Sequence, residues 1–257
     1  MIDPADILGL RGRRVLVTGG SRGVGRAVAL VLTRAGAEVG VAYRSRGQDA
    51  EDLVARVRQL GGRGWSHSGD LRDPEVVARL FDVFEAEYGG VDVVVGNHGV
   101  WPADHVPLAR MELDQWRRTL EINLDGMFLV CREAARRLTA GGRLIVVTST
   151  AAQRGEAGHG DYAASKGALN SLVKGLAEEL GVRGITVNAV APGWVDTEMT
   201  ESVLVGERRA RAIGEIPLGR IARPEDVAGP VVFLASELGR HVTGEILNVN
   251  GGSVRPG

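Results

Sequence analysis

The sequence predicts an α/β protein built on a doubly wound parallel sheet of seven strands, with helices on both faces. Three observations support this prediction. Short runs rich in Val, Leu and Ile alternate with segments of helical periodicity along all 257 residues. Several of these runs are nearly continuous in apolar residues, as expected for strands that helices cover on both faces. A glycine-rich turn joins the first strand to the first helix, where such folds bind ligands.

The elements follow one another without a linker or a short-period repeat, so we expect residues 1–257 to form one domain with right-handed crossovers. The expected strands are Arg14–Thr18, Glu38–Tyr43, Gly64–Ser68, Val91–Gly96, Arg143–Thr148, Ile185–Val190 and Ile246–Asn250. The expected helices are Gly25–Ala35, Ala50–Leu60, Pro74–Tyr88, Glu112–Leu138, Asp161–Leu180 and Pro224–Ser236. The longest irregular segment, 192–223, is expected to be a mobile lid over a substrate site, and we call it the lid segment.

Composition and charge exclude several classes of function. A net charge of −1 gives no reason to expect a nucleic-acid partner. No apolar run approaches membrane-spanning length, and the segment Met1–Asp6 is acidic where a secretory signal would be basic. Cys131 is the one cysteine, so no disulfide can form within the chain. We therefore expect a cytoplasmic protein that binds neither nucleic acid nor membrane.

The turn after the first expected strand reads Thr18-Gly-Gly-Ser-Arg-Gly-Val-Gly25. Glycine at 19, 23 and 25 permits a tight turn and brings backbone N–H groups close to a pyrophosphate at the helix N-terminus. Between a strand and a helix, this pattern predicts a Rossmann-type dinucleotide site, with a glycine-rich turn that binds nothing as the alternative. The expected cofactor contacts in this loop are Gly19, Ser21, Arg22, Gly23, Val24 and Gly25.

The residues after the second expected strand predict which dinucleotide binds. The strand ends in Tyr43-Arg44-Ser45-Arg46, with no carboxylate to bind the 2′-hydroxyl of NAD. A guanidinium matches the oxygens of a 2′-phosphate, so Arg44 and Ser45, with Arg22 nearby, favour NADP(H). The alternative is that these arginines are only solvated.

Tyr162 and Lys166 form the most informative pair in the chain. The sequence has three tyrosines and only two lysines among its 31 basic residues, yet these two lie four positions apart in an expected helix. Such residues share one helix face. A phenol titrates near ~10 and needs about 4 kcal/mol to act near pH ~7, which one ammonium at ~4 Å supplies in an effective dielectric of ~20. We expect Lys166 to lower the pKa of Tyr162; the alternative is a packed Tyr beside a solvated Lys.

Taken together, these motifs resemble the short-chain dehydrogenase/reductase family, from the glycine loop to Asn248-Val-Asn-Gly-Gly252. The positions that match the catalytic tetrad of the family are Asn123, Ser149, Tyr162 and Lys166. The resemblance implies that Tyr162 protonates a carbonyl oxygen as hydride arrives from the nicotinamide, and that Ser149 donates a hydrogen bond to that oxygen. It implies that Lys166 lowers the tyrosine pKa and binds the nicotinamide ribose. The backbone of Asn123 would anchor a water that leads protons to Lys166.

The resemblance also implies further cofactor contacts. Asp70 and Leu71 match the residues that meet the adenine, and Asn97 and Gly99 match the motif after the fourth strand. In the lid segment, the matching positions are Pro192, Gly193, Val195 and Thr197. Gly96 and His98 depart from the usual motif; His98 either faces the nicotinamide region or fills space.

The resemblance is strongest to bacterial 3-oxoacyl-(acyl-carrier-protein) reductases and to glucose dehydrogenase-like members. It implies reduction of a small-molecule ketone to a secondary alcohol, with an acyl-carrier-protein-bound thioester as one candidate. Such reductases present basic residues beside the mouth of the active site, and Arg183 matches one of them. The alternatives are a sugar or polyol dehydrogenase and a catalytically silent NADP-binding regulator. The family resemblance also implies a homotetramer, formed through the long middle helix and the last strand.

Overall fold

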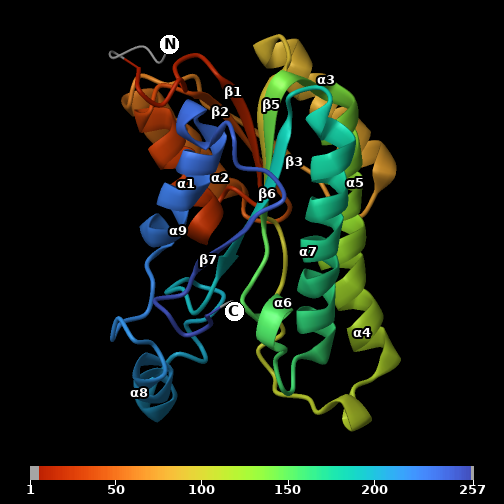
Figure 1. Ribbon diagram of the computed structural model, residues 1–257, viewed down its shortest axis with the longest axis vertical. Coiled ribbons are helices and arrows are strands. Elements are labelled where there is room, and N and C mark those ends of the chain that lie inside the picture. Colours follow the sequence, from red (N-terminus) through yellow and green to blue (C-terminus); the bar gives the residue numbers. More distant parts are fainter. Residues whose placement is uncertain (1–5, 256–257) are drawn as a thin grey trace.

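A computed structural model describes residues 6–255 of the chain. Their strands form one seven-stranded sheet in the order β3-β2-β1-β4-β5-β6-β7 (Figure 1), and every neighbouring pair is parallel. The strands are β1 (Arg14–Thr18), β2 (Glu38–Tyr43), β3 (Trp65–Ser68), β4 (Val91–Gly96), β5 (Leu138–Val147), β6 (Thr186–Pro192) and β7 (Ile246–Val249). The predicted fold class is therefore confirmed. The prediction that residues 1–257 form a single domain includes residues 1–5 and 256–257, and these lie outside the described residues.

Helices cover both faces of the sheet (Figure 1). One face carries α1 (Gly23–Arg34), α2 (Gly47–Gln59) and α9 (Pro224–Ala235), and its core includes Val28, Leu32 and Val231. The other carries α3 (Pro74–Tyr88), α4 (Leu113–Leu120), α5 (Gly126–Arg137) and α7 (Gly160–Gly181), around Phe81, Met127 and Leu169. These apolar layers explain why the inner strands are almost purely aliphatic. Within residues 6–255, no helix combines the length and the apolar character that crossing a membrane requires.

The chain reverses its direction of travel across the sheet at β1. It runs outward from β1 to β2 and β3, and then returns to β4 on the other side of β1. Loops that leave β1 and β4 at their carboxyl ends therefore diverge, and ligands of such sheets bind in the crevice between them. The glycine loop follows β1, and the segment Asn97-His98-Gly99 follows β4. The topology thus places two of the predicted motifs side by side.

Three details differ from the sequence-based prediction. The expected helix Glu112–Leu138 is divided into α4 and α5 by a π-helical turn at Glu121–Asp125. Strand β5 begins at Leu138 rather than Arg143, and its pairing with β4 shifts register between Val91 and Val93. A short helix, α6 (Ala151–Arg154), precedes α7, and a second, α8 (Gly206–Gly214), lies within the lid segment. Both short helices are too brief to give a clear apolar period.

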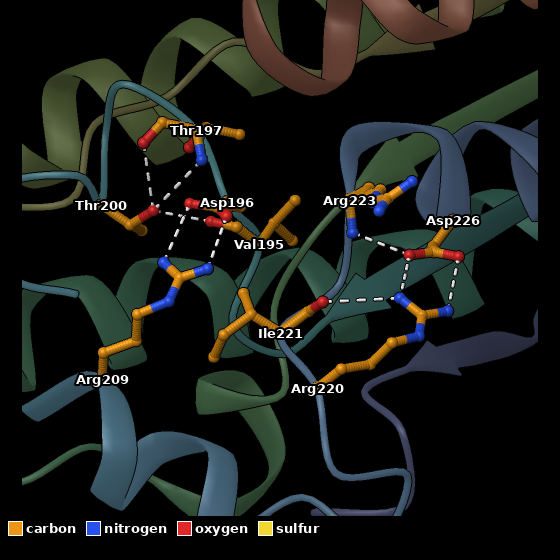
Figure 2. A network of polar contacts seen from close by, with 9 residues as sticks. All are labelled: Val195, Asp196, Thr197, Thr200, Arg209, Arg220, Ile221, Arg223 and Asp226. Carbon is orange, nitrogen blue, oxygen red and sulfur yellow. Dashed lines mark hydrogen bonds and ion pairs between the residues drawn. The ribbon is translucent and has the colours of Figure 1, made fainter. Parts of the chain in front are cut away.

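The lid segment is folded rather than irregular, and it is held by ion pairs (Figure 2). Arg209 pairs with Asp196 at 2.7 Å, and Arg220 pairs with Asp226 of α9 at 2.5 Å. The Thr200 hydroxyl donates a hydrogen bond to the Val195 carbonyl at 2.6 Å (Figure 2). The apolar side chains of the lid segment form a small core of their own, made of Trp194, Leu204, Ala212, Ile213, Ile216 and Ile221. The predicted mobility of this segment stays a prediction.

Candidate active site

A cleft with a volume of about 370 Å³ runs along the carboxyl edge of the sheet, between the sheet and the lid segment. Most of the predicted site residues line it: Gly19, Ser21, Arg22, Gly23, Val24, Arg44, Ser45, Asp70, Leu71, Asn97, Gly99, Ser149, Tyr162, Lys166, Pro192, Gly193, Val195 and Thr197. Gly25 and Asn123 are the two that do not: Gly25 packs against the Gly19 carbonyl, and the side chain of Asn123 is fully buried. Segments far apart in the sequence therefore meet in one cavity.

The glycine loop has the conformation that its composition predicts. Gly19 and Gly23 adopt positive φ angles of 62° and 52°, which favour glycine. A Cβ atom at Gly25 would clash with the carbonyl oxygen of Gly19 and would lie 2.6 Å from Nδ2 of Asn97. That amide nitrogen donates hydrogen bonds to the carbonyls of Thr18 and Gly19, at 3.2 and 3.0 Å. Asn97 therefore fixes the shape of the loop.

The start of α1 fits a phosphate group. No side chain caps its first N–H groups, and its first turn carries no acidic residue. Uncapped N–H groups at a helix N-terminus attract anions through their hydrogens and through the helix dipole. Arg22, the residue before the helix, lines the same part of the cleft as Gly23 and Val24. This donor set is suited to the pyrophosphate of a dinucleotide.

A cluster of arginines surrounds the corner next to β2. Arg22, Arg44, Arg46 and Arg72 line it, and within residues 6–255 Arg44 forms no ion pair. Asp70 lies in this corner, and Arg72 binds its carboxylate at 2.6 Å. A second carboxylate, that of Glu198 in the lid segment, lies near Gly23. Hydrogen bonds from Arg72 lower the pKa of Asp70 to about 2. The expected adenine contact therefore comes from a carboxylate that Arg72 already binds, and the corner keeps an excess of positive charge.

Tyr162 and Lys166 lie on the cleft side of α7, as their spacing predicts. The ammonium of Lys166 lies 6.0 Å from the centre of the Tyr162 ring and donates a hydrogen bond to the Val147 carbonyl at 3.0 Å. Burial lowers the pKa of Lys166 to about 8. Burial also raises the pKa of Tyr162 to about 12, although the Ser149 hydroxyl acts in the opposite direction. For the chain alone, the expected lowering of the Tyr162 pKa is wrong, because desolvation dominates.

Ser149 and Asn123 occupy different positions around this pair. Ser149 follows β5, lines the cleft, and accepts a hydrogen bond from the Ala151 N–H at 3.1 Å. Asn123 lies in the π-helical turn and is fully buried. Its amide accepts from the Val100 N–H at 2.7 Å and donates to the Val100 carbonyl at 2.9 Å and to the Ser165 hydroxyl at 3.2 Å. The Asn123 side chain thus ties the segment after β4 to α7, beside Lys166.

His98, for which the sequence left two interpretations, packs behind the glycine loop. Its Nδ1 lies 2.8 Å from the Thr18 hydroxyl, and its Nε2 is buried without a hydrogen-bond partner among the described residues. Burial lowers the pKa of His98 to about 3, so the ring is neutral near pH 7. It reaches the inner wall of the cleft, but its contacts support the loop. These contacts favour the interpretation that His98 fills space behind the loop.

The residues on the substrate side of the cleft were not predicted from the sequence. Trp101, Glu156 and Trp194 line it beside Ser149 and Tyr162. All three come from loops, where residue spacing carries no periodic signal. The one available clue was that two of the four tryptophans of the chain lie within a few residues of predicted site motifs.

Within its own chain, Arg183 does not lie beside the mouth of the cleft, where the resemblance placed it. Arg183 follows α7 and precedes β6, so within this chain it lies at the amino edge of the sheet, opposite the cleft. Its guanidinium donates hydrogen bonds to the carbonyls of Ala135 and Leu138, where α5 meets β5. In the single chain, Arg183 therefore joins a helix end to a strand.

Comparisons with known proteins identify the family of this chain. Residues 19–253 match the family model described as enoyl-(acyl carrier protein) reductase. The 3-oxoacyl-(acyl-carrier-protein) reductase FabG of Salmonella typhimurium is 37% identical over 249 residues, which cover 95% of this chain and 98% of that protein. A short-chain dehydrogenase from Burkholderia cenocepacia, solved in complex with NADP, superposes with a TM-score of 0.89 and 37% identity, over 95% of this chain and 98% of that one. The chain belongs to the short-chain dehydrogenase/reductase family.

Relatives within the short-chain dehydrogenase/reductase family are named for different activities. Versicolorin reductase from Emericella nidulans is 38% identical over 261 residues, covering 96% of this chain and 97% of that protein. It is therefore as similar to this chain as the Salmonella protein. Membership of the short-chain dehydrogenase/reductase family thus does not determine the substrate.

Proposed function

We propose that this oxidoreductase reduces a small-molecule ketone to a secondary alcohol with NADP(H) as its cofactor and Tyr162 as the general acid. One observation carries the proposal: Ser149, Tyr162 and Lys166 line the same cleft as the glycine loop and the arginines after β2. Three independent requirements of a reductase therefore meet in one cavity. These are a dinucleotide cradle, a proton donor and a hydrogen-bond donor for the carbonyl oxygen.

NADP(H) fits the corner after β2 better than NAD(H). The excess of arginine there matches a 2′-phosphate, and the acidic residue Asp70 is engaged by Arg72. When bound, the nicotinamide supplies or accepts the hydride. The cofactor named for the similar Burkholderia structure is also NADP.

The side chains at the other end of the cleft handle the proton. Tyr162, with a pKa of about 12, is protonated at neutral pH and can donate its proton to a carbonyl oxygen. The hydroxyl of Ser149 donates a second hydrogen bond to that oxygen and orients it. Lys166, with a pKa of about 8, carries a positive charge at neutral pH, and this charge stabilises the phenolate that remains. Asn123 holds the segment that packs against Lys166 and, through its backbone, anchors the water that returns a proton.

We propose a ketone as the substrate. A 3-oxoacyl thioester on an acyl carrier protein is one candidate, because the FabG relative is named for that substrate. A sugar or polyol dehydrogenase and a silent NADP-binding regulator are the alternatives. Assembly as a homotetramer and a cytoplasmic location stay predictions.

Steady-state assays of the purified protein test the proposal. Oxidation of NADPH and of NADH is followed with a panel of aryl ketones, 3-oxoacyl thioesters and, in the reverse direction, free sugars. We expect ketone-dependent oxidation with a higher kcat/KM for NADPH than for NADH. Tight NADPH binding without turnover of any compound would instead support the silent regulator. Oxidation of sugars at rates above those of ketone reduction would support the polyol dehydrogenase.

A further inference from the structure

Two indole rings and a carboxylate form the substrate side of the cleft. Trp101 and Trp194 meet edge to face, with ring centres 5.7 Å apart and planes at 87°. The indole N–H of Trp101 donates a hydrogen bond to Glu156 Oε1 at 3.3 Å. All three side chains line the cleft together with Tyr162. The reacting carbonyl would therefore lie next to aromatic surface and a carboxylate.

The wall that carries Trp101 and Glu156 is built to stay in place. The Trp101 ring packs on His159 with centres 4.7 Å apart, and His159 lies 5.9 Å from His105. The Val106 N–H donates a hydrogen bond to the Gly158 carbonyl at 2.9 Å, which joins the two loops again. His159 precedes α7, and Tyr162 lies in the first turn of that helix. Glu156 and the Tyr162 phenol are thus held in one fixed arrangement.

Trp194 continues this aromatic surface from the lid segment. It follows β6 at the start of the lid segment and packs with Leu204, Ala212 and Ile216 of that segment. Backbone hydrogen bonds from Gly193 to Val249 at 3.0 Å and from Ala222 to Trp194 at 3.1 Å hold its ends. A flat ring fits this surface because aromatic side chains favour stacked and edge-to-face contacts with other rings.

The two ends of the cleft carry different sets of charged side chains. The dinucleotide end carries the arginine corner described above. On the substrate side the lining includes the carboxylates of Glu156 and Glu215, the exposed cation Arg154 and the buried ammonium of Lys166. Within residues 6–255, Glu156 forms no ion pair, and its second carboxylate oxygen accepts no hydrogen bond. A half-buried carboxylate with a free oxygen accepts a hydrogen bond from a ligand and repels an anion.

We propose that Trp101, Trp194 and Glu156 form a specificity subsite for a flat ring that adjoins the ketone. This subsite selects an aromatic ketone that carries an O–H or N–H donor, and it disfavours anionic substrates. The proposal rests on the proposed ketone reduction at Tyr162 and identifies the substrate class for that same site. Trp101 and Glu156 are specificity-determining residues in this assignment, because they contact the substrate away from the reacting bond.

Three acetophenones that differ in one meta substituent test the subsite. The hydroxyl-substituted ketone offers a donor, the methoxy-substituted ketone offers none, and the carboxylate-substituted ketone is anionic. For the wild type, we expect kcat/KM to be about tenfold lower for the methoxy-substituted ketone than for the hydroxyl-substituted one, because the hydrogen bond to the Glu156 carboxylate is lost. We expect a still lower kcat/KM for the carboxylate-substituted ketone, because its negative charge is repelled by Glu156.

Glu156→Gln removes the charge and keeps the shape. We expect it to raise kcat/KM for the carboxylate-substituted ketone about tenfold relative to the methoxy-substituted one. Glu156→Leu removes the acceptor and should abolish the preference for the hydroxyl-substituted ketone. Glu201→Gln, at an exposed carboxylate outside the cleft lining, is the matched control and should leave all three ratios unchanged. Equal NADPH affinity and equal thermal midpoints would show that the variants are folded.

The outcomes separate this inference from the proposed function. If the wild type reduces no ketone, the proposed function is wrong, and the subsite falls with it. If it reduces all three acetophenones equally and Glu156→Gln changes none of the ratios, ketone reduction stands and the subsite is overturned. A third result would also overturn the subsite: a 3-oxoacyl thioester on an acidic carrier protein is reduced with a higher kcat/KM than all three acetophenones, and Glu156→Gln leaves that kcat/KM unchanged.

Discussion

The ammonium of Lys166 lies 6.0 Å from the centre of the Tyr162 ring, and both side chains project from α7 into the same cleft. Burial moves both pKa values toward the neutral forms, to about 8 for Lys166 and about 12 for Tyr162. The chain therefore holds a desolvated cation beside a desolvated phenol. Such a pair costs stability in the resting protein and becomes useful when negative charge develops on the phenol oxygen.

Tyr162→Phe tests the proton donor. We expect kcat for ketone reduction to fall by about 10²-fold or more, because general acid catalysis is lost, whereas NADPH affinity should change little. Steady-state rates and a fluorescence titration with NADPH measure the two effects. Tyr88→Phe is the control, because the Tyr88 hydroxyl lies outside the cleft and donates hydrogen bonds to the carbonyls of Arg63 and Val39, at 2.7 and 3.1 Å. The control should lose stability and keep kcat. A near-wild-type rate in Tyr162→Phe would contradict the role of Tyr162 as the general acid.

Lys166→Met should make the protein more stable and inactive. The pKa of Lys166 falls from its ordinary value of 10.5 to about 8 in the folded chain, which corresponds to about 3 kcal/mol of unfavourable burial below pH 8. The variant also loses the hydrogen bond to the Val147 carbonyl, and this loss offsets about 1 kcal/mol of the gain in stability. Urea unfolding at pH 7 should therefore show a free energy of unfolding about 2 kcal/mol higher in the variant. A variant less stable than the wild type at pH 7 would contradict this account.

The same lysine predicts a pH dependence with a definite sign. Between pH 8 and 10.5 the unfolded state binds more protons at Lys166 than the folded state does, so the stability of the wild type rises with pH in this interval. The advantage of Lys166→Met should shrink accordingly as the pH is raised from 8 to 10.5. Unfolding curves of both proteins across that range measure the effect, and a constant difference would argue against a buried, charged Lys166.

Arg44→Asp should change the choice of cofactor. A carboxylate at this position repels a 2′-phosphate and can bind the 2′-hydroxyl of NAD. We expect KM for NADPH to rise about tenfold or more, and the ratio of kcat/KM for NADH over NADPH to increase. Arg56→Asp, at an exposed position of α2 outside the cleft lining, makes the same charge change and should leave this ratio unaltered. An unchanged ratio in Arg44→Asp would show that the arginine corner does not contact the phosphate.

Gly25→Ala and Gly175→Ala compare two helical glycines with opposite surroundings. A Cβ at Gly25 would clash with the Gly19 carbonyl, whereas a Cβ at Gly175, in α7, meets nothing within 4 Å. Gly25→Ala should distort the glycine loop, weaken NADPH binding strongly and destabilise the fold by about 1–3 kcal/mol. Gly175→Ala should stabilise it by about 0.5–1 kcal/mol, because alanine loses less backbone entropy. Thermal unfolding with and without NADPH measures both, and unimpaired NADPH binding in Gly25→Ala would contradict the close approach.

The sequence alone predicted the order of the elements, the glycine loop and the Tyr162–Lys166 pair, because these features depend on short-range patterns. Alternating apolar runs report which segments are strands and which are helices, and residues four apart in a helix share a face. Arg44 was identified in the same way, as the residue directly after a strand end. Each of these inferences uses contacts between residues that are near one another in the chain.

Tertiary structure decided the rest, because it sets distances between residues far apart in the chain and the water they lose. The π-helical turn that buries Asn123, and the hydrogen bonds that place Arg183 at the amino edge of the sheet, depend on packing between elements. So does the meeting of Trp101, Glu156 and Trp194. Residue spacing predicted that the ammonium of Lys166 would face the phenol, but only the folded chain showed that desolvation raises the pKa of Tyr162 rather than lowering it.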